Sequence, residues 1–144
     1  MNVETKLAVV QNVYATQMAE TTSYLTKAGL LETIVEEKRP ILFDHAERNL
    51  QAFGITKPED VFLTLSDIFS CAKWQIETTD HGFRAINETC KLCATAKSKE
   101  TDSPCDLYCL VPMESMVKGL SIDYMYKVES TLWDAGRCSI LVTK

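Results

Sequence analysis

The spacing of the apolar residues changes near residue 72, and this change limits the fold more than any other feature of the sequence. In the first half of the chain, apolar side chains recur every three or four residues, for example Leu7, Val10 and Tyr14, which is typical of an amphipathic helix. Beyond residue 72 they alternate with polar residues, as Trp74 and Ile76 do, which is typical of a half-buried strand. The sequence therefore predicts an α+β fold in which N-terminal helices pack on an antiparallel sheet.

Glycine and proline residues divide the helical half of the chain. The first helix should end near Gly29, and Pro40 should begin a new helix that ends at Gly54. Thr56 and Glu59 have the spacing of a capping box, so another helix should begin there. The first half of the chain is therefore expected to contain several short helices after one long one.

The second half of the chain should form two hairpins. Residues 79–82 and 134–136 have turn composition, and each turn separates two alternating segments. The last strand, 138–142, carries Cys138 on its apolar face. A cysteine-bearing helix is expected to join the two hairpins.

Length and composition indicate one soluble domain. The 144 residues fit a single domain with a helical part, 1–71, and a sheet and cysteine-cluster part, 72–144. Hydrophobic residues make up 46% and charged residues 24% of the chain, and the net charge of −5 argues against a nucleic-acid partner. The N-terminal segment lacks an unbroken apolar core, so neither a signal peptide nor a membrane span is expected. The predicted location is the cytoplasm.

Four of the six cysteines lie in the segment TCKLCATAKSKETDSPCDLYC, residues 89–109. In a reducing compartment, clustered cysteines indicate metal ligation or reactivity before structural disulfides. Cys90 and Cys93 have C-x-x-C spacing, and Cys105 and Cys109 should share one face of a helix. The segment therefore predicts a metal site made by these four thiolates, most simply four-coordinate Zn²⁺, with iron or an iron–sulfur centre as the alternative.

Other residues are weaker candidates. Cys71 extends an apolar helix and is expected to serve packing alone, whereas Cys138 could be an additional ligand or site thiol. Arg84 could bind the carboxylate of a ligand, although an ion pair with Glu77 across the hairpin is favoured. Trp74 is first a core residue and second a wall of a ligand pocket.

The run CDLYCLVPMESMVKGLSIDYMYKVESTLWDAGRCSILV, residues 105–142, resembles the C-terminal half of four-vinyl reductase-like domains. Its ending also resembles the L-2-amino-thiazoline-4-carboxylate hydrolase-like family. The resemblance implies an α+β domain that binds small hydrophobic ligands, often within sensors. The four-vinyl reductase-like pattern usually has one more cysteine before its final glycine, which this chain lacks. The resemblance implies that Cys105 or Cys109 is the helix cysteine of the family and that Gly119 ends this helix. It also implies that Glu129, Gly136 and Cys138 lie in the final hairpin.

Three functions are compatible with these residues. The favoured one is a metal-binding, small-ligand-binding or sensory domain with a cysteine cluster. The alternative is a hydrolase of a small cyclic or thiol-derived substrate, with Cys105 as nucleophile near a helix N-terminus. Thiol–disulfide exchange through Cys90 and Cys93 is disfavoured, because no βαβ pattern surrounds this pair.

The expected partners are a small-molecule ligand and a second copy of the chain. The apolar stripe from Leu7 to Met18 lies on a long helix beside a small body. One sheet cannot bury this stripe and that of the following helices together. The sequence therefore predicts a homodimer with this helix at the subunit contact, and the alternative is that the stripe is simply part of the core.

Overall fold

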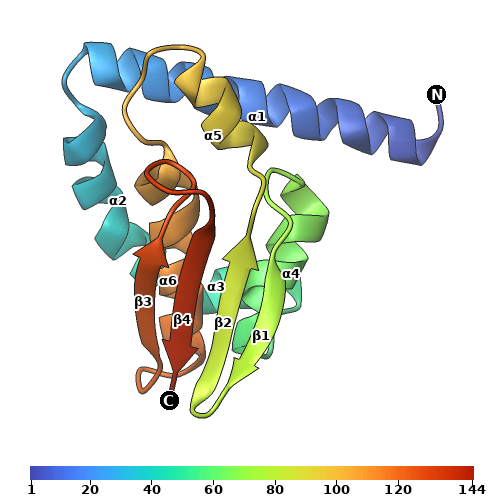
Figure 1. Ribbon diagram of the computed structural model, residues 1–144, viewed down its shortest axis with the longest axis vertical. Coiled ribbons are helices and arrows are strands. Elements are labelled where there is room, and N and C mark those ends of the chain that lie inside the picture. The colour runs from blue at the N-terminus through green and yellow to red at the C-terminus, as the bar shows by residue number, and fades with distance from the viewer.

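The computed structural model describes residues 1–144, and its helices cover one face of a single four-stranded antiparallel sheet. The helices α3, α4 and α6 lie behind the sheet in Figure 1, and α1 crosses the end of the molecule at which α5 lies. The N-terminal end of α1 projects beyond the rest of the molecule. The predicted α+β fold, with helices first and two hairpins after them, is confirmed.

Two helices make up the first third of the chain: α1, Val3–Lys27, and α2, Leu31–Asp44. They are separated at Gly29, which adopts a left-handed φ of 69°, as the sequence predicted. The predicted helix start at Pro40 is wrong, because α2 continues through Pro40 and ends before His45. No side chain of α2 is fully buried, and an exposed helix tolerates a proline better because water can serve the freed carbonyl group. None of the helices is both long enough and apolar enough to cross a bilayer.

Helix α3, Ala46–Phe53, ends at Gly54 in the left-handed conformation, as predicted. Helix α4, Pro58–Phe69, begins one residue later than the capping-box pattern implied. Its N-cap is Lys57, and no side chain caps the first turn, so the predicted capping box is wrong. The reason is Pro58, whose fixed φ and missing N–H suit the first helical position and thereby set the start of the helix.

The strands β1, Gln75–Thr79, and β2, Gly82–Asn87, form the first hairpin, and β3, Met125–Ser130, and β4, Cys138–Thr143, form the second. Pairing of β2 with β4 joins the hairpins, so the strand order is β1-β2-β4-β3. The β3–β4 register shifts between Val128 and Ser130. Both predicted hairpins are therefore present, and the two central strands belong to different hairpins.

Three helical pieces connect the hairpins: α5, Lys91–Lys97, the π-helix η1, Asp106–Leu110, and α6, Val111–Leu120. The sequence predicted ordinary α-helix through Cys105 and Cys109, and this is wrong for the first turn. The wider π-turn changes the direction of side chains relative to an α-helix, and such turns are frequent at functional sites.

Gly119 lies inside α6 and does not end it, in contrast to the role that the family resemblance implied. A Cβ atom at this position would lie 2.8 Å from the Cβ atom of Ala46 on α3. Such a contact is too short for carbon atoms. The glycine therefore allows α3 and α6 to approach closely.

The core fills the space between the helices and the inner face of the sheet. Phe62 of α4 is fully buried and packs edge-on against Trp74, with ring centroids 5.3 Å apart, and against Phe83, at 5.8 Å. The alternation of β4 turns Cys138, Ile140 and Val142 inward, as the sequence predicted. This inner face ends at the cysteine cluster.

Candidate metal centre

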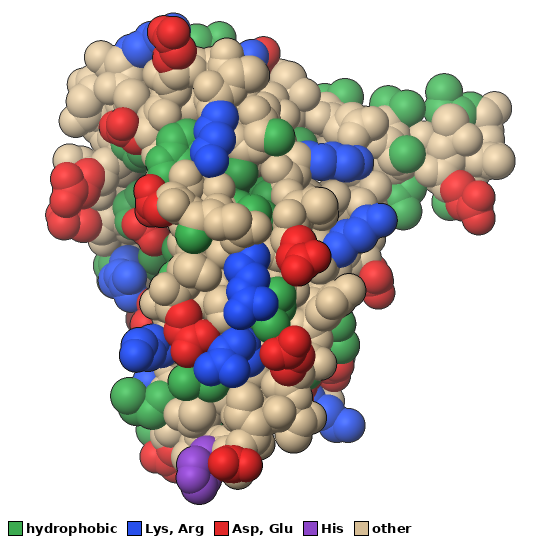
Figure 2. Space-filling view, in the orientation of Figure 1, with side chains coloured by type: hydrophobic (Ala, Val, Ile, Leu, Met, Phe, Trp, Pro, Cys, Tyr) green, Lys and Arg blue, Asp and Glu red, His purple; other side chains and the backbone are tan.

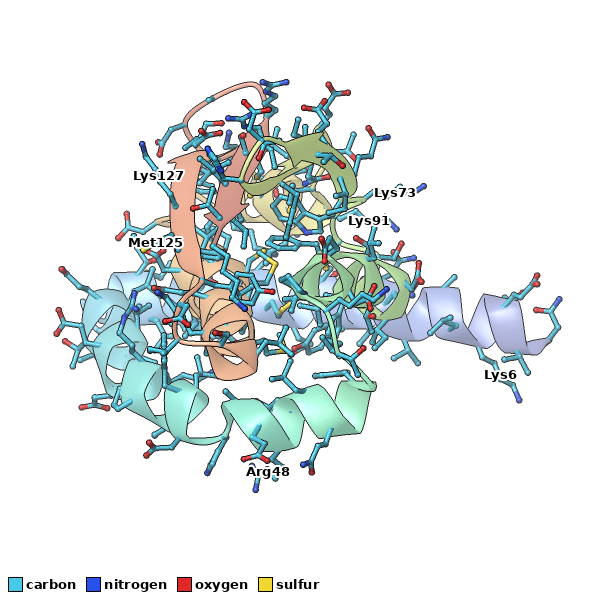
Figure 3. The ribbon with its side chains drawn as sticks, turned by 90° about the horizontal axis from the view of Figure 1, so that it is seen from below. Lys6, Arg48, Lys73, Lys91, Met125 and Lys127 are labelled. Atoms are coloured by element: carbon cyan, nitrogen blue, oxygen red, sulfur yellow. The ribbon has the colours of Figure 1, made fainter.

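All six cysteines of the chain line one cavity of about 270 Å³ between the helices and the inner face of the sheet. They come from four parts of the chain, the end of α4, α5, η1 and the start of β4, which the fold brings together in its interior. In Figure 3, several sulfur atoms lie in this interior, whereas the charged side chains of Lys6, Arg48 and Lys127 point outward. The lining residues are Cys71, Cys90, Cys93, Cys105, Cys109 and Cys138 together with mainly apolar side chains.

Cys93 and Cys105 are in direct contact, with their Sγ atoms 3.7 Å apart. Two sulfurs that each lie about 2.3 Å from one tetrahedral ion are about 3.8 Å from each other. The observed separation therefore matches one edge of a tetrahedral thiolate site. Cys93 lies on α5 and Cys105 directly precedes η1, so this contact joins the two halves of the cysteine segment.

Cys90 is the N-cap of α5, and its Sγ accepts a hydrogen bond from the backbone N–H of Cys93 at 3.4 Å. The Cys93 thiol and the backbone N–H groups of Cys93 and Leu92 lower the pKa of Cys90 to about 6. The neighbouring Cys105 and Cys90 thiols, together with burial, raise the pKa of Cys93 itself. Of this pair, Cys90 is therefore the thiol that ionises first.

The Cys105 thiol also has a lowered pKa. The Cys93 thiol is the main cause, and Ser103 contributes a further hydrogen bond. In addition, the backbone N–H of Cys105 donates to Ser103 Oγ at 3.2 Å, just before the start of this helical segment.

The remaining thiols lie in a less polar environment. Burial raises the pKa of Cys71 and of Cys138 to about 11, and raises that of Cys109 well above its ordinary value. The backbone N–H of Leu132 donates to Cys138 Sγ at 3.2 Å, which partly offsets this effect. These three thiols are therefore protonated at neutral pH unless a cation lies beside them.

The donor set fits a soft metal ion, because the ligating groups on the cavity wall are thiols and the wall contains no His, Asp or Glu. The structure contains no group of three or more Cys, His, Asp or Glu side chains arranged to hold one ion. A four-sulfur shell built on the Cys93–Cys105 pair would therefore require Cys90 and Cys109 to move toward it.

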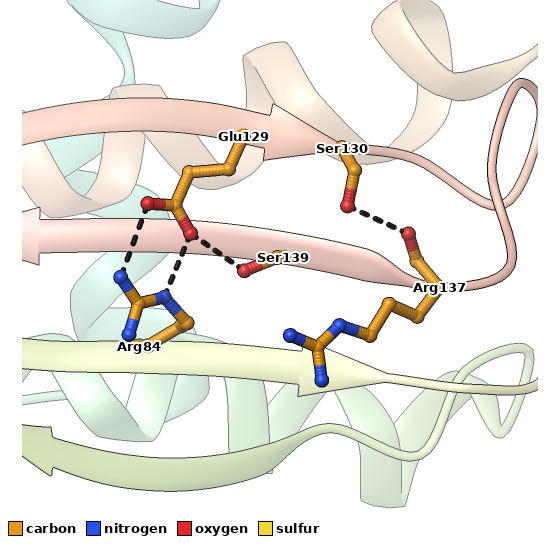
Figure 4. A network of polar contacts seen from close by, with 5 residues as sticks. All are labelled: Arg84, Glu129, Ser130, Arg137 and Ser139. Atoms are coloured by element: carbon orange, nitrogen blue, oxygen red, sulfur yellow. Dashed lines mark hydrogen bonds and ion pairs between the residues drawn. The ribbon is translucent and has the colours of Figure 1, made fainter.

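The two residues predicted to contact a ligand lie in different places. Trp74 lines the cavity, but Arg84 lies on the opposite, open face of the sheet. The Arg84 guanidinium binds both carboxylate oxygens of Glu129, at 2.7 and 3.1 Å, and Ser139 Oγ donates to the same carboxylate at 2.7 Å (Figure 4). The predicted ion pair with Glu77 is therefore wrong, because Arg84 reaches over β4 to β3.

Cys71 was expected to serve packing alone, yet it lines the same cavity as the other thiols. The backbone places it there, because the N–H of Lys91 donates to the Cys71 carbonyl at 2.8 Å and Ala72 pairs with Cys90 as an isolated bridge. No local pattern around Cys71 indicates this pairing. The one feature of the sequence that could have indicated a shared site for Cys71 is the large number of cysteines, six in 144 residues.

No protein-family model, curated protein or solved structure matches the chain. The resemblance to four-vinyl reductase-like and L-2-amino-thiazoline-4-carboxylate hydrolase-like proteins therefore stays a prediction.

Proposed function

We propose that the protein is a metal-binding domain of the small-ligand-binding or sensory class, in which Cys90, Cys93, Cys105 and Cys109 hold a soft ion, most simply Zn²⁺. The observation that carries this proposal is the Cys93–Cys105 sulfur pair, 3.7 Å apart, in a cavity lined by every cysteine of the chain. Thiolates select zinc, copper(I) or iron–sulfur centres over hard cations.

The chain's own groups prepare the thiolates for binding. The N–H of Cys93 is directed at Cys90 Sγ and stabilises its negative charge, and the Cys93 thiol does the same for Cys105. Bound Zn²⁺ would supply a cross-link between α5 and η1. Thiols must lose their protons on binding, so metal loading should release protons and stabilise the fold.

The cavity beside the thiols supports the small-ligand part of the proposal. Its wall is largely apolar and includes Trp74, Phe53 and Met116, and Lys38 is its one charged side chain. A small, mainly apolar molecule bound there would contact the cysteine cluster directly. Ligand binding and metal binding would then affect each other, which is the property that a sensory domain needs.

Elemental analysis of the full chain, purified without oxygen, tests the proposal. Wild-type protein should contain stoichiometric metal, and Cys93→Ser should lose most of it. Met116→Leu is the matched control, because it changes the cavity wall without removing a thiol, and it should keep the metal. Wild-type protein that binds no zinc or iron after full reduction would exclude the proposal.

A nucleophilic Cys105 is the alternative, and its lowered pKa favours it. In this case, Cys105 would form a covalent adduct with a small cyclic or thiol-derived substrate. Mass spectrometry of metal-free protein incubated with such compounds should detect an adduct on Cys105, and Cys105→Ser should abolish it. An unmodified Cys105 with stoichiometric metal in the same preparation would favour the metal site.

We also propose that the projecting part of α1 forms a homodimer contact. Val10 is 63%, Val13 56% and Leu7 47% exposed, although all three are apolar. The hydrophobic side chains of this arm are visible in Figure 2. Light scattering at micromolar concentration should give twice the mass of one chain, and Val10→Glu should give the mass of one. A monomeric wild-type protein would contradict this contact.

A further inference from the structure

The fold brings two more thiols to the cavity than a single tetrahedral ion can use. A closed zinc shell takes four sulfurs, yet Cys71 and Cys138 line the cavity beside the four cysteines of the 89–109 segment. No cysteine of the chain lies elsewhere. The cavity therefore contains the full thiol content of the protein.

Cys71 and Cys138 reach the cavity from two different elements, the end of α4 and the start of β4. Cys71 follows α4 and is held beside Cys90 by the Ala72–Cys90 bridge and by the Lys91 N–H to Cys71 carbonyl hydrogen bond. Cys138 begins β4, where Asn87 of β2 pairs with it. Both thiols are close enough to Cys90 to interact with its charge.

We propose that the cavity binds two soft divalent ions in a binuclear thiolate centre to which all six cysteines contribute, with Cys93 and Cys105 as the shared sulfurs. Two tetrahedral ions need eight sulfur positions, and six sulfurs supply them when two of the six bridge both ions. The bridging sulfurs form the edge that both tetrahedra share. The Cys93–Cys105 separation of 3.7 Å has the length of that edge.

The charge balance is compatible with this arrangement. Six thiolates and two divalent ions carry a net charge of −2, which is the same as four thiolates and one ion. The second ion therefore adds no net charge to a largely apolar cavity. Binding of the second ion releases the protons of Cys71 and Cys138, two thiols that stay protonated in the absence of a cation. This inference rests on the proposed metal-binding function and specifies its stoichiometry.

Titration of reduced, metal-free full-length protein with Co²⁺ in the absence of oxygen tests the stoichiometry. The sulfur-to-cobalt charge-transfer absorption should rise until two equivalents have been added. Cys71→Ser should weaken or abolish the second binding step, and Met18→Leu, a change in the same cavity wall that removes no thiol, should keep both steps.

Alkylation of the wild-type protein gives a second measurement that does not depend on the folding of a variant. With two equivalents of Zn²⁺ bound, all six cysteines should stay unmodified at a pH at which iodoacetamide alkylates Cys71 and Cys138 of the metal-free protein. A titration that saturates at one equivalent, with Cys71 and Cys138 alkylated, would overturn the binuclear centre and leave the single-ion site intact. A wild-type protein that binds no Co²⁺ would overturn both.

Discussion

The two faces of the sheet carry ionisable side chains under opposite conditions. On the inner face, burial raises the pKa of Cys138 to about 11, so the thiol avoids a charge. On the outer face, Arg84 and the Ser139 hydroxyl lower the pKa of Glu129 to about 2, so the carboxylate stays charged. Acidic and basic side chains alternate over this open face in Figure 2. One face of the same sheet therefore disfavours charged side chains, whereas the other face carries charged side chains in contact with water.

This difference shows which ionisable side chains depend on specific neighbours for their charge. An exposed ion pair is screened by water and salt, so it contributes little to stability and needs no further partner. A buried thiol becomes a thiolate only where a specific group stabilises the charge, as the Cys93 thiol and N–H do for Cys90. The thiols of the cavity beneath the sheet therefore ionise only beside a stabilising group, which supports the proposed role in metal binding.

The largest expected effect is the loss of packing on the inner face. Ile140 of β4 is fully buried, and Ile140→Ala should lower the free energy of unfolding by about 2–5 kcal/mol through lost burial and a cavity. Leu141 is the next residue, points to the outer face and is only partly buried, so Leu141→Ala should cost clearly less. Urea denaturation of both variants measures the difference, and equal losses would contradict the assignment of the two faces.

Metal removal should produce the next largest effect. At a free Zn²⁺ concentration 100-fold above the dissociation constant, binding should stabilise the fold by about 2.7 kcal/mol, and raise Tm by roughly 5–10 °C. A chelator should reverse this rise in wild-type protein. Cys93→Ser is the control, and its Tm should not change with zinc or chelator. A wild-type Tm that is independent of zinc would argue against a metal site on the inner face.

The order in which the thiols ionise gives a third expectation, for the metal-free protein. Cys90 should react with iodoacetamide with a midpoint near pH 6, whereas Cys138 should need a pH near 11. Brief alkylation at several pH values, followed by peptide mass spectrometry, measures both midpoints. Cys93→Ala should raise the Cys90 midpoint, because it removes the thiol that contributes most to the lowered pKa. Reaction of Cys138 before Cys90 would contradict the described environments.

The sequence predicted the elements of the fold well, because periodicity and turn residues act locally. The change of spacing near residue 72, the left-handed Gly54 and the inward face of β4 all follow from neighbouring residues. The errors at Pro40 and at the first turn of the Cys105 helix have a different origin. In both places the wider context decides which backbone hydrogen bonds form, and a local pattern does not contain that context.

The candidate site could be predicted only in part for the same reason. The cysteines of the 89–109 segment are close in sequence, so their spacing already indicated a cluster. The position of Cys71 depends on a bridge between residues 72 and 90, and the partner of Arg84 depends on the pairing of β2 with β4. Such contacts join segments that are distant in sequence and form only once the sheet is assembled, so local sequence patterns do not indicate them.

The smallest expected effect belongs to the ion pair on the outer face. Glu129→Gln should lower stability slightly at neutral pH, because the amide keeps the size of the side chain but removes the charge that Arg84 and Ser139 bind. The difference from wild type should shrink in 1 M salt, which screens exposed charges. Urea denaturation at low and high salt measures both effects.

The pH dependence of the stability difference between wild type and Glu129→Gln shows whether the charge of Glu129 causes it. The pKa of Glu129 in the folded protein, about 2, lies below the value of about 4.3 for an unfolded glutamate. The contribution should therefore be complete above about pH 4.3 and should disappear as the pH falls through 2, because folded and unfolded states then bind the same proton. Wild type and Glu129→Gln should thus converge in acid. A difference that persists below pH 2, or one that is insensitive to salt, would indicate that Glu129 contributes through packing, and the contrast between the two faces would no longer rest on charge.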